Sequence, residues 1–380
     1  MNVDLELLKR LIAIRSDREA QPRRGSVERG VADYLETYIE RHLPTYRVRR
    51  QVVTPGRVNL VVTPRKRVQA GVLLIGHMDT VPLGTGWRYR SLGQRVGSRL
   101  YGRGSADMKA GLVAILVVLE HAAVHGCSNV AALFYADEEY DFVGMKQFVR
   151  TAGLPRPRLV ICPEPTNLAL RAGCRGVLEL DVAVRGKSGH AARPWSGVSA
   201  FEGLLAGVDA LKRLVRMTND RVLGKPTLNV TGVRCGIGDG STAPANVIPD
   251  TCSATIEVRT VTGLTPQRII RTFERAVRAY GANPATTTKN SLGSFTTPRS
   301  KLRLVEQAQR SVLGRVSYAP AGKGGYSDIQ LLAERWRVPA VLLGPTGAGM
   351  HGLDEFVTLQ SIADLSAILC EVVDNATARL

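Results

Sequence analysis

Long hydrophobic runs are missing from this sequence of 380 residues. A transmembrane helix needs about 20 consecutive apolar residues, and the longest candidates, such as residues 112–119, are too short. The first ten residues also lack the apolar core and the small-residue cleavage site of a secretory signal. We therefore expect a cytoplasmic protein that does not associate with a membrane.

Cysteine is scarce, with six residues and no C-x-x-C pair. A structural thiolate zinc site uses such pairs, and a disulfide framework is typical of small secreted domains. Neither is expected here, and the sequence favours free thiols that are buried or half-buried. Internal repeats and low-complexity tracts are absent too, which argues against a repeat architecture.

Acidic residues are outnumbered: 33 Asp and Glu stand against 51 Lys and Arg, which gives a net charge of +18. Such an excess can indicate nucleic acid, an acidic partner or an anionic substrate. The basic residues are spread along the chain, and no aromatic-rich RNA-binding motif accompanies them. We favour a solvated basic surface without a nucleic-acid partner.

The chain is too long for one compact core, which predicts two domains. Four short runs rich in β-branched residues are typical of buried strands; they are residues 71–75, 130–135, 159–162 and 338–343. Helical patterns surround them; they cover residues 4–13, 26–43 (with Ser26 as N-cap), 109–123 and 359–373. Buried strands separated by helices predict an α/β fold, with a mostly parallel sheet and helices on both faces.

The middle of the chain has a different pattern. Apolar and polar residues alternate along 178–185 and 252–259, which predicts antiparallel strands with one solvated face. Helical stretches near 199–216 and 265–280 could cover the other face. We expect a smaller α+β lid or dimerisation domain at 176–292, inserted into a catalytic domain made of 1–175 and 293–380.

Acidic residues and histidines follow all four buried runs; they are His77 and Asp79, Asp137, Glu138 and Glu139, Glu164, and His351. Singly, each has a plain structural explanation, such as a solvated turn or a helix N-cap at Asp107. Together they lie beyond the carboxyl ends of strands in one predicted sheet, where α/β proteins form their sites. Histidine and carboxylate are the ligands of hydrolytic zinc sites, and a metal pair needs a bridging carboxylate.

Eight segments of the chain match, in order and spacing, the motifs of one family. They are GHMDTVP at 76–82, YGRGSADMKAG at 101–111, YADEE at 135–139, CPEPTNL at 162–168, GKSGHAARP at 186–194, NVIPD at 246–250, GGYSD at 324–328 and MHGLDEFV at 350–357. With them the chain resembles the M20 metallopeptidase family, especially its acetylornithine deacetylase and succinyl-diaminopimelate desuccinylase branch.

The resemblance implies two divalent metal ions, zinc first and cobalt or manganese as alternatives. One ion would be held by His77, Asp107 and Glu164. The other would be held by Asp107, Glu139 and His351, so that Asp107 bridges the pair. Asp79 would orient His77.

The resemblance also implies catalytic and substrate-binding roles. Glu138 would be the general base that activates the bridging water and later protonates the leaving amine. His190, in the inserted domain, would stabilise the oxyanion, often from a partner subunit of a homodimer. A substrate carboxylate would meet Arg259 and Asn246, and Gly324 and Gly325 would let the backbone approach the substrate.

Several residues depart from the family pattern. Tyr140 follows the acidic motif where many relatives have Gly, and Tyr326 replaces the Thr of desuccinylases. Residues 226–236 and the ending 344–357 are more like the deacetylase side. The acyl group therefore stays open.

The expected function is hydrolysis of an N-acyl amino acid, in amino-acid biosynthesis. A carboxypeptidase or dipeptidase acting on small peptides is the first alternative, and removal of an amino acid from an acidic carrier protein is a further one. A non-catalytic binding protein would be expected to lack a ligand or the base, and neither is missing here.

Overall fold

The structure is a computed structural model that describes residues 4–19, 27–66, 71–151, 154–238, 242–322 and 325–377. It divides into two compact units. The first comprises residues 1–172, 297–319 and 327–380, and the second comprises residues 173–296 and 320–326. Each unit is described separately.

The first unit is built on a mostly parallel six-stranded sheet, as predicted. Its order is β1 (Tyr46–Thr54), β2 (Arg57–Pro64), β6 (Val130–Tyr135), β3 (Val72–His77), β7 (Leu159–Cys162) and β14 (Ala340–Leu342). The last four strands run parallel, and the β1–β2 hairpin joins them antiparallel through β6. A second sheet, with small antiparallel strands, is made of β15 (Gly347–Ala348), β16 (Phe356–Thr358), β5 (Arg99–Tyr101) and β4 (Gln94–Val96).

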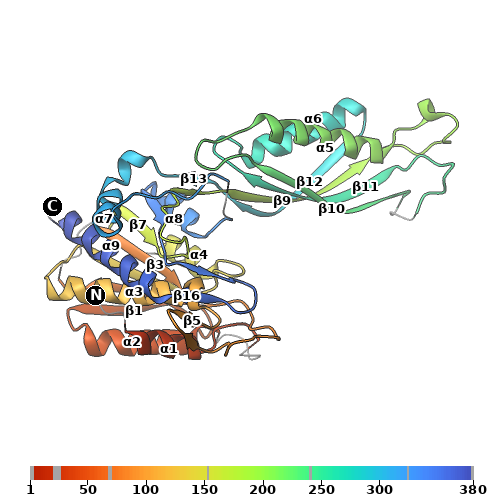
Figure 1. Cartoon of the computed structure of the whole chain (residues 1–380). Coiled ribbons are helices and arrows are strands. Elements are labelled where there is room, and N and C mark those ends of the chain that lie inside the picture. The colour runs from red at the N-terminus through yellow and green to blue at the C-terminus, as the bar shows by residue number, and fades with distance from the viewer. Residues whose placement is uncertain are drawn as a thin grey trace. The chain divides into compact units, whose positions relative to one another are not determined.

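Helices cover both faces of the main sheet (Figure 1). One apolar cluster joins alternate strand residues to five helices; these are α1 (Leu5–Ala13), α2 (Arg29–His42), α3 (Ala110–Val124), α7 (Arg303–Leu313) and α9 (Leu359–Thr377). The intervening strand residues, such as Leu73 and Leu133, are buried without belonging to that cluster. On their side α4 (Val143–Thr151) packs against α8 (Ile329–Trp336).

The four predicted strands are confirmed as β3, β6, β7 and β14, with ends that differ by at most two residues. The four predicted helices are confirmed as α1, α2, α3 and α9. Ser26, the predicted N-cap of α2, lies outside the described residues. The hydrophobic pattern located these elements because each buries a continuous apolar face.

The second unit is a four-stranded antiparallel sheet covered by two helices (Figure 1). Its order is β10 (Thr227–Gly236), β11 (Thr251–Thr260), β9 (Gly176–Arg185) and β12 (Asn283–Leu292). The apolar residues of β9 and β11 pack on α5 (Ala200–Met217) and α6 (Pro266–Tyr280), as the alternation predicted. Ser199 and Thr265 cap these helices by accepting hydrogen bonds from backbone N–H groups three residues on. The short strands β8 (Gly173–Cys174) and β13 (Phe295–Thr296) have two residues each and pair with one another.

Two cysteines differ from the expectation of free thiols. Cys235 and Cys252 form a disulfide. They are direct neighbours in the register of β10 and β11, so strand pairing brings together residues that are 17 positions apart. The other four cysteines are buried.

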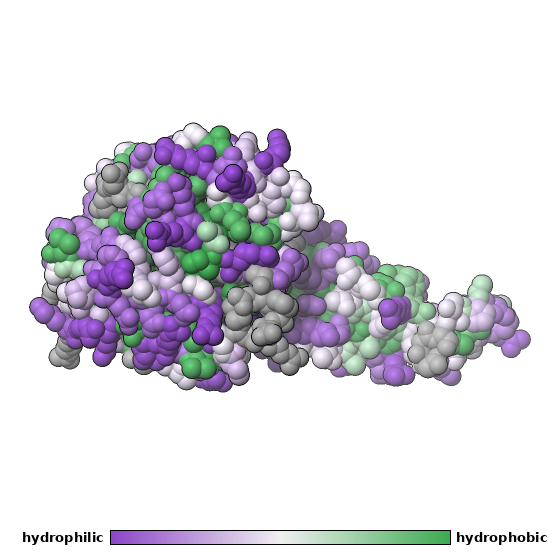
Figure 2. Space-filling model, turned by 90° about the horizontal axis from the view of Figure 1, so that it is seen from below, coloured by the Kyte–Doolittle hydropathy of each residue, from purple (hydrophilic) through white to green (hydrophobic). Residues whose placement is uncertain are grey.

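One face of the molecule is mostly polar (Figure 2). In Figure 2, which shows one face of the molecule, hydrophilic residues cover most of the area and hydrophobic ones are scattered. Across the described residues, no helix combines the length and apolar character needed to cross a membrane.

A buried amide connects this scaffold to the end of β6. The Asn59 side chain donates to Gln51 Oε1 at 2.7 Å and to the Gly144 carbonyl at 2.8 Å. Its Oδ1 accepts from the Ala136 N–H at 3.1 Å. Ala136 directly precedes the acidic segment 137–139, so Asn59 fixes where that segment leaves the sheet.

We expect Asn59→Ala to lower the free energy of unfolding by about 2–3 kcal/mol, because it leaves buried polar groups unpaired. Denaturant titration followed by circular dichroism measures this cost. Asn283→Ala, an exposed change on β12, is the matched control and should stay within about 0.5 kcal/mol. Equal effects of the two substitutions would contradict a structural role for Asn59.

Candidate metal centre

His77 ends β3, and its imidazole is fully buried. Its Nε2 lies 3.1 Å from Asp107 Oδ1 and 3.5 Å from Glu164 Oε1. Its Nδ1 lies 3.0 Å from the backbone carbonyl of Asp79. Because that carbonyl accepts the Nδ1 hydrogen, Nε2 is left facing the two carboxylates, as in a histidine that ligates a metal.

His351 faces the other oxygen of Asp107. Its Nε2 lies 3.3 Å from Asp107 Oδ2 and 3.1 Å from Glu139 Oε2. His351 follows β15 with a left-handed backbone (φ 61°), and its side chain remains 59% exposed. The five residues predicted as ligands therefore meet, and the Asp107 carboxylate lies between the two histidines.

The donor set fits divalent cations of the zinc type. The nitrogen–oxygen separations of 3.1–3.5 Å are close to the roughly 3.3 Å expected between two ligands of one tetrahedral zinc ion. One ligand atom from each of His77, Asp107 and Glu139 can be chosen so that all three lie within 4.8 Å of one another.

The carboxylates of the candidate centre lie close together, and their pKa values and that of His351 are shifted. Burial and then the negative charge of Asp107 raise the pKa of Glu164. Hydrogen bonds to Asp107 and Glu139 raise the pKa of His351 to about 10. Burial opposes ionisation of Asp107, but its hydrogen bonds with His351 and His77 lower the pKa below its usual range. A cation at this point would compensate the negative charges.

Asp79 links the two sides of the site. Its carboxylate is buried and accepts the N–H of Glu138 at Oδ1 and the N–H of Glu139 at Oδ2, both at 3.1 Å. Its Oδ1 also lies 3.6 Å from His77 Nδ1. Asp79 therefore holds the backbone of the acidic segment as well as the histidine ring, which goes beyond the role predicted for it.

Asp137 shapes the acidic segment through two arginines, which the sequence did not indicate. It is buried and has a left-handed backbone (φ 70°). Its Oδ1 lies 2.8 Å from Arg57 and 2.9 Å from Arg18, and Arg57 also pairs with buried Glu28. The Asp137 carboxylate is thus neutralised on the scaffold side, while Glu139, two residues further on, faces His351 at 3.1 Å.

Glu355 is a further residue that sequence reasoning missed. It is 1% exposed, and its carboxylate accepts four hydrogen bonds. Oε1 accepts from the N–H groups of Ala106 and Asp107 at 3.0 Å, and Oε2 accepts from the Gly104 N–H at 3.0 Å and Arg103 at 2.8 Å. Glu355 lies in the quoted motif MHGLDEFV, and that position was the available signal.

Glu138, the predicted base, is half-buried and has a second carboxyl nearby. Burial and then the charge of Asp328 raise the pKa of Glu138. Asp328 accepts a 2.8 Å hydrogen bond from Tyr135, and burial raises the pKa of its own carboxyl to about 7. A base with a raised pKa is suited to take up a proton near neutral pH.

The remaining predicted residues belong to the second unit. His190 is exposed. It lies near Asn246 along the backbone, because the N–H of the next residue, Ala191, donates to the Asn246 carbonyl at 2.8 Å. Arg259 lies near the end of β11. Gly325 is exposed, and Gly324 lies outside the described residues.

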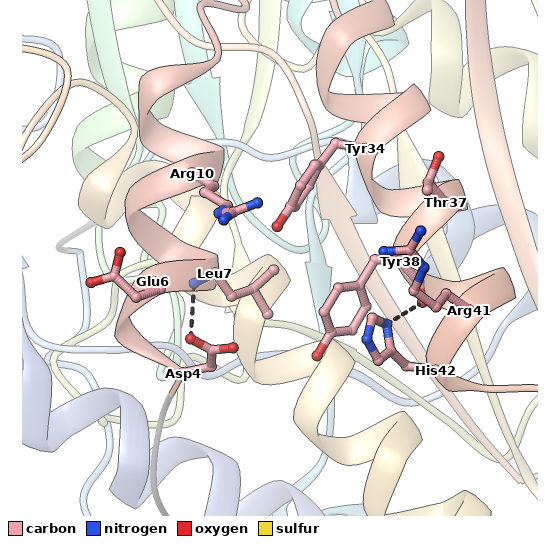
Figure 3. Close-up of a pocket in the computed structure, with 9 residues that line it drawn as sticks. All are labelled: Asp4, Glu6, Leu7, Arg10, Tyr34, Thr37, Tyr38, Arg41 and His42. Carbon is pink, nitrogen blue, oxygen red and sulfur yellow. Dashed lines mark hydrogen bonds between the residues drawn. The ribbon is translucent and has the colours of Figure 1, made fainter.

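A separate pocket of about 320 Å³ opens between α1 and α2 (Figure 3). Asp4 caps α1 by accepting from the Leu7 N–H at 3.0 Å, and His42 Nδ1 bonds the Tyr38 carbonyl at 2.9 Å. These groups serve their own helices and share no residue with the candidate metal centre. The pocket is lined by Asp4, Glu6, Leu7, Arg10, Tyr34, Thr37, Tyr38, Arg41 and His42.

Two curated relatives show the level of sequence similarity. A probable carboxypeptidase of Talaromyces marneffei is 32% identical over 260 residues, covering 61% of this chain and 56% of the relative, so the match spans just over half of that relative's length. A succinyl-diaminopimelate desuccinylase of Acidiphilium cryptum is 27% identical over 330 residues, covering 84% and 87%.

Solved structures share the fold. A dinuclear metal-binding peptidase of the M20 family from Bacillus subtilis superimposes with a TM-score of 0.70 at 15% identity, covering 99% of this chain and 98% of that one. The sequence model of Peptidase family M20/M25/M40 matches residues 73–375, which includes every residue of the candidate metal centre. The chain belongs to the M20/M25/M40 family of peptidases.

Proposed function

We propose that this chain is a metal-dependent amidohydrolase that cleaves the amide bond of an N-acyl amino acid, as acetylornithine deacetylases and succinyl-diaminopimelate desuccinylases do. The observation that carries the proposal is the Asp107 carboxylate, which presents one oxygen to His77 and the other to His351. Such a carboxylate is what a pair of metal ions requires. A cytoplasmic role in amino-acid biosynthesis goes with this proposal.

His77, Asp107 and Glu164 would hold one ion, and Asp107, Glu139 and His351 the other. Zinc suits this donor set best, with cobalt and manganese as alternatives. When bound, such ions polarise a carbonyl and lower the pKa of water. The Bacillus subtilis peptidase of similar fold is a dinuclear metal-binding protein, which supports two ions.

The chain's own residues would move the proton. Glu138 would take it from the attacking water and deliver it to the leaving nitrogen. Asp79 keeps Glu138 in place through the backbone bond described above. His190 would donate a hydrogen bond to the developing oxyanion.

Substrate recognition is proposed to use the second unit. Arg259 and Asn246 would bind a substrate carboxylate, and the backbone at Gly324 and Gly325 would approach the substrate. Cleavage of small peptides by a carboxypeptidase or dipeptidase reaction is the second candidate, since a curated relative is a probable carboxypeptidase.

The first experiment is hydrolysis by the metal-reconstituted protein of N-acetylornithine, N-succinyl-diaminopimelate, other N-acyl amino acids and dipeptides. We expect turnover of one class, lost on chelation and restored by zinc. Glu138→Ala should lower kcat by about 10²–10⁴-fold, because it removes the general base, while its metal content stays unchanged. Glu334→Ala, an exposed change on α8, is the control. Full activity in Glu138→Ala would sink the proposed mechanism.

Glu355→Gln tests how Asp107 is held. The amide nitrogen of Gln would face two donors at one of the two oxygens of Glu355 and break that pair of bonds. We expect metal affinity to fall about 10–100-fold, measured by metal content after dialysis against a graded chelator. Glu334→Gln should bind metal as the wild type does. Unaltered affinity in Glu355→Gln would show that Asp107 does not depend on these bonds.

A homodimer through the second unit is also proposed. An apolar groove of about 560 Å³ lies between α5 and β10, and Phe201, Leu205 and Val233 around it are 39–48% exposed. β10 is an edge strand of its sheet, so its backbone can pair with another copy. The groove is therefore suited to an isologous contact.

Leu205→Glu should convert the dimer to a monomer, because it places a charge in the groove. Size-exclusion chromatography with light scattering gives the mass. Val124→Glu, at an 82% exposed position of α3, is the control. A monomeric wild type, or a dimer in both variants, would contradict the proposed interface.

A further inference from the structure

The Arg259 side chain is held on one edge by a carboxylate of its own strand. Its Nε donates to Glu257 Oε1 at 2.9 Å, and its Nη2 donates to Glu257 Oε2 at 3.4 Å. The two residues are two positions apart on β11, so their side chains leave the same face of the sheet. This is a side-on pairing that occupies the Nε–Nη2 edge of the guanidinium.

The flat face of the same guanidinium is covered by Tyr326. The Arg259 Cζ lies 4.7 Å from the centroid of the Tyr326 ring. Tyr326 is 36% exposed and lies in the returning segment 320–326, which belongs to the same unit as β11. The Thr of desuccinylases has no ring with which to stack, so this contact distinguishes the present chain.

The outer edge of the Arg259 guanidinium stays available for a ligand. Within the described residues, Glu257 and Tyr326 are the recorded partners of Arg259. The outer Nη1–Nη2 edge can still donate two parallel hydrogen bonds. The Arg259 side chain is 29% exposed, so a ligand can reach it. Because one edge and one face are fixed, the direction of the remaining donors is fixed as well.

We propose that Glu257 and Tyr326 are positioning residues: they hold Arg259 so that its outer edge points end-on at the substrate carboxylate that Arg259 is proposed to bind. This inference rests on the proposed function. A carboxylate accepts two parallel bonds from the outer edge, whereas a neutral primary amide offers only one acceptor oxygen. Pre-orientation also reduces the rotamer freedom that Arg259 loses on binding.

The test compares two substrates that differ only at that group: the acyl amino acid that the wild type hydrolyses best, and its primary carboxamide. Steady-state KM and kcat are measured for the wild type, Glu257→Ala, Tyr326→Thr and Tyr326→Phe. For the carboxylate substrate we expect KM to rise about 10-fold in Glu257→Ala and about threefold in Tyr326→Thr, with kcat changed less than twofold. Tyr326→Phe keeps the ring, so its KM should stay near the wild-type value.

The carboxamide separates positioning from a general structural effect, since its KM should change less than about twofold in every variant. A lower KM for the carboxylate substrate in Glu257→Ala would mean that Glu257 competes with the substrate, which overturns the inference. Parallel changes for both substrates, or none for either, also overturn it. If the wild type hydrolyses no acyl amino acid or peptide, the proposed function fails, and calorimetric binding of the free amino acid and its amide to the same variants then decides the inference alone.

Discussion

Asp107 has to present its two oxygens in two directions at once, and the rest of the candidate centre depends on how that carboxylate is held. It sits on the irregular turn Ser105–Lys109, where no regular helix fixes its direction. Glu355 supplies the missing constraint, because it accepts the N–H of Asp107 and of Ala106 from about 250 residues further along the chain. The acid thereby ties the turn before α3 to the loop that carries His351.

A buried group of carboxylates is costly unless positive charge offsets it. On the scaffold side, Arg57 and Arg18 neutralise Asp137, and Arg103 neutralises Glu355. Facing the site, burial and then neighbouring carboxylates raise the pKa of Glu138 and of Glu164, so ionisation is unfavourable there without a cation. The arginines therefore stabilise the surrounding carboxylates of Asp137 and Glu355. The negative charge without an arginine partner lies where a divalent cation would bind. This division explains why a chain with a large excess of basic residues can still concentrate acidity at one place.

Hydrophobic patterning predicted the main sheet, the helices named above and the alternating strands of the second unit, because each element has a single buried face. It also placed His77, Glu139 and Glu164 after neighbouring strands, so their meeting followed from the sheet topology. The parts that could not be predicted depend on contacts with no periodic signal. Glu355 and Asp328 act through backbone and side-chain bonds across 190 residues or more. The Cys235–Cys252 bond depends on the register of a hairpin that composition cannot define.

The residues proposed to hold the metal ions lie in the first unit, and the residues proposed to select the substrate lie in the second. In the first group, His77, Glu139 and Glu164 lie at or after the ends of main-sheet strands, Asp107 lies on the turn Ser105–Lys109, and His351 follows β15. A change of residue type at any of them would remove a proposed ligand. The second group lies on β11, with Arg259 and Glu257, and on the segment 320–326, with Tyr326. A substitution of Glu257 or Tyr326 would alter the direction of the Arg259 guanidinium and leave the proposed metal ligands unchanged. Substrate preference can therefore change by single substitutions while the chemistry is retained. Under the proposal above, Tyr326 in place of Thr is such a substitution.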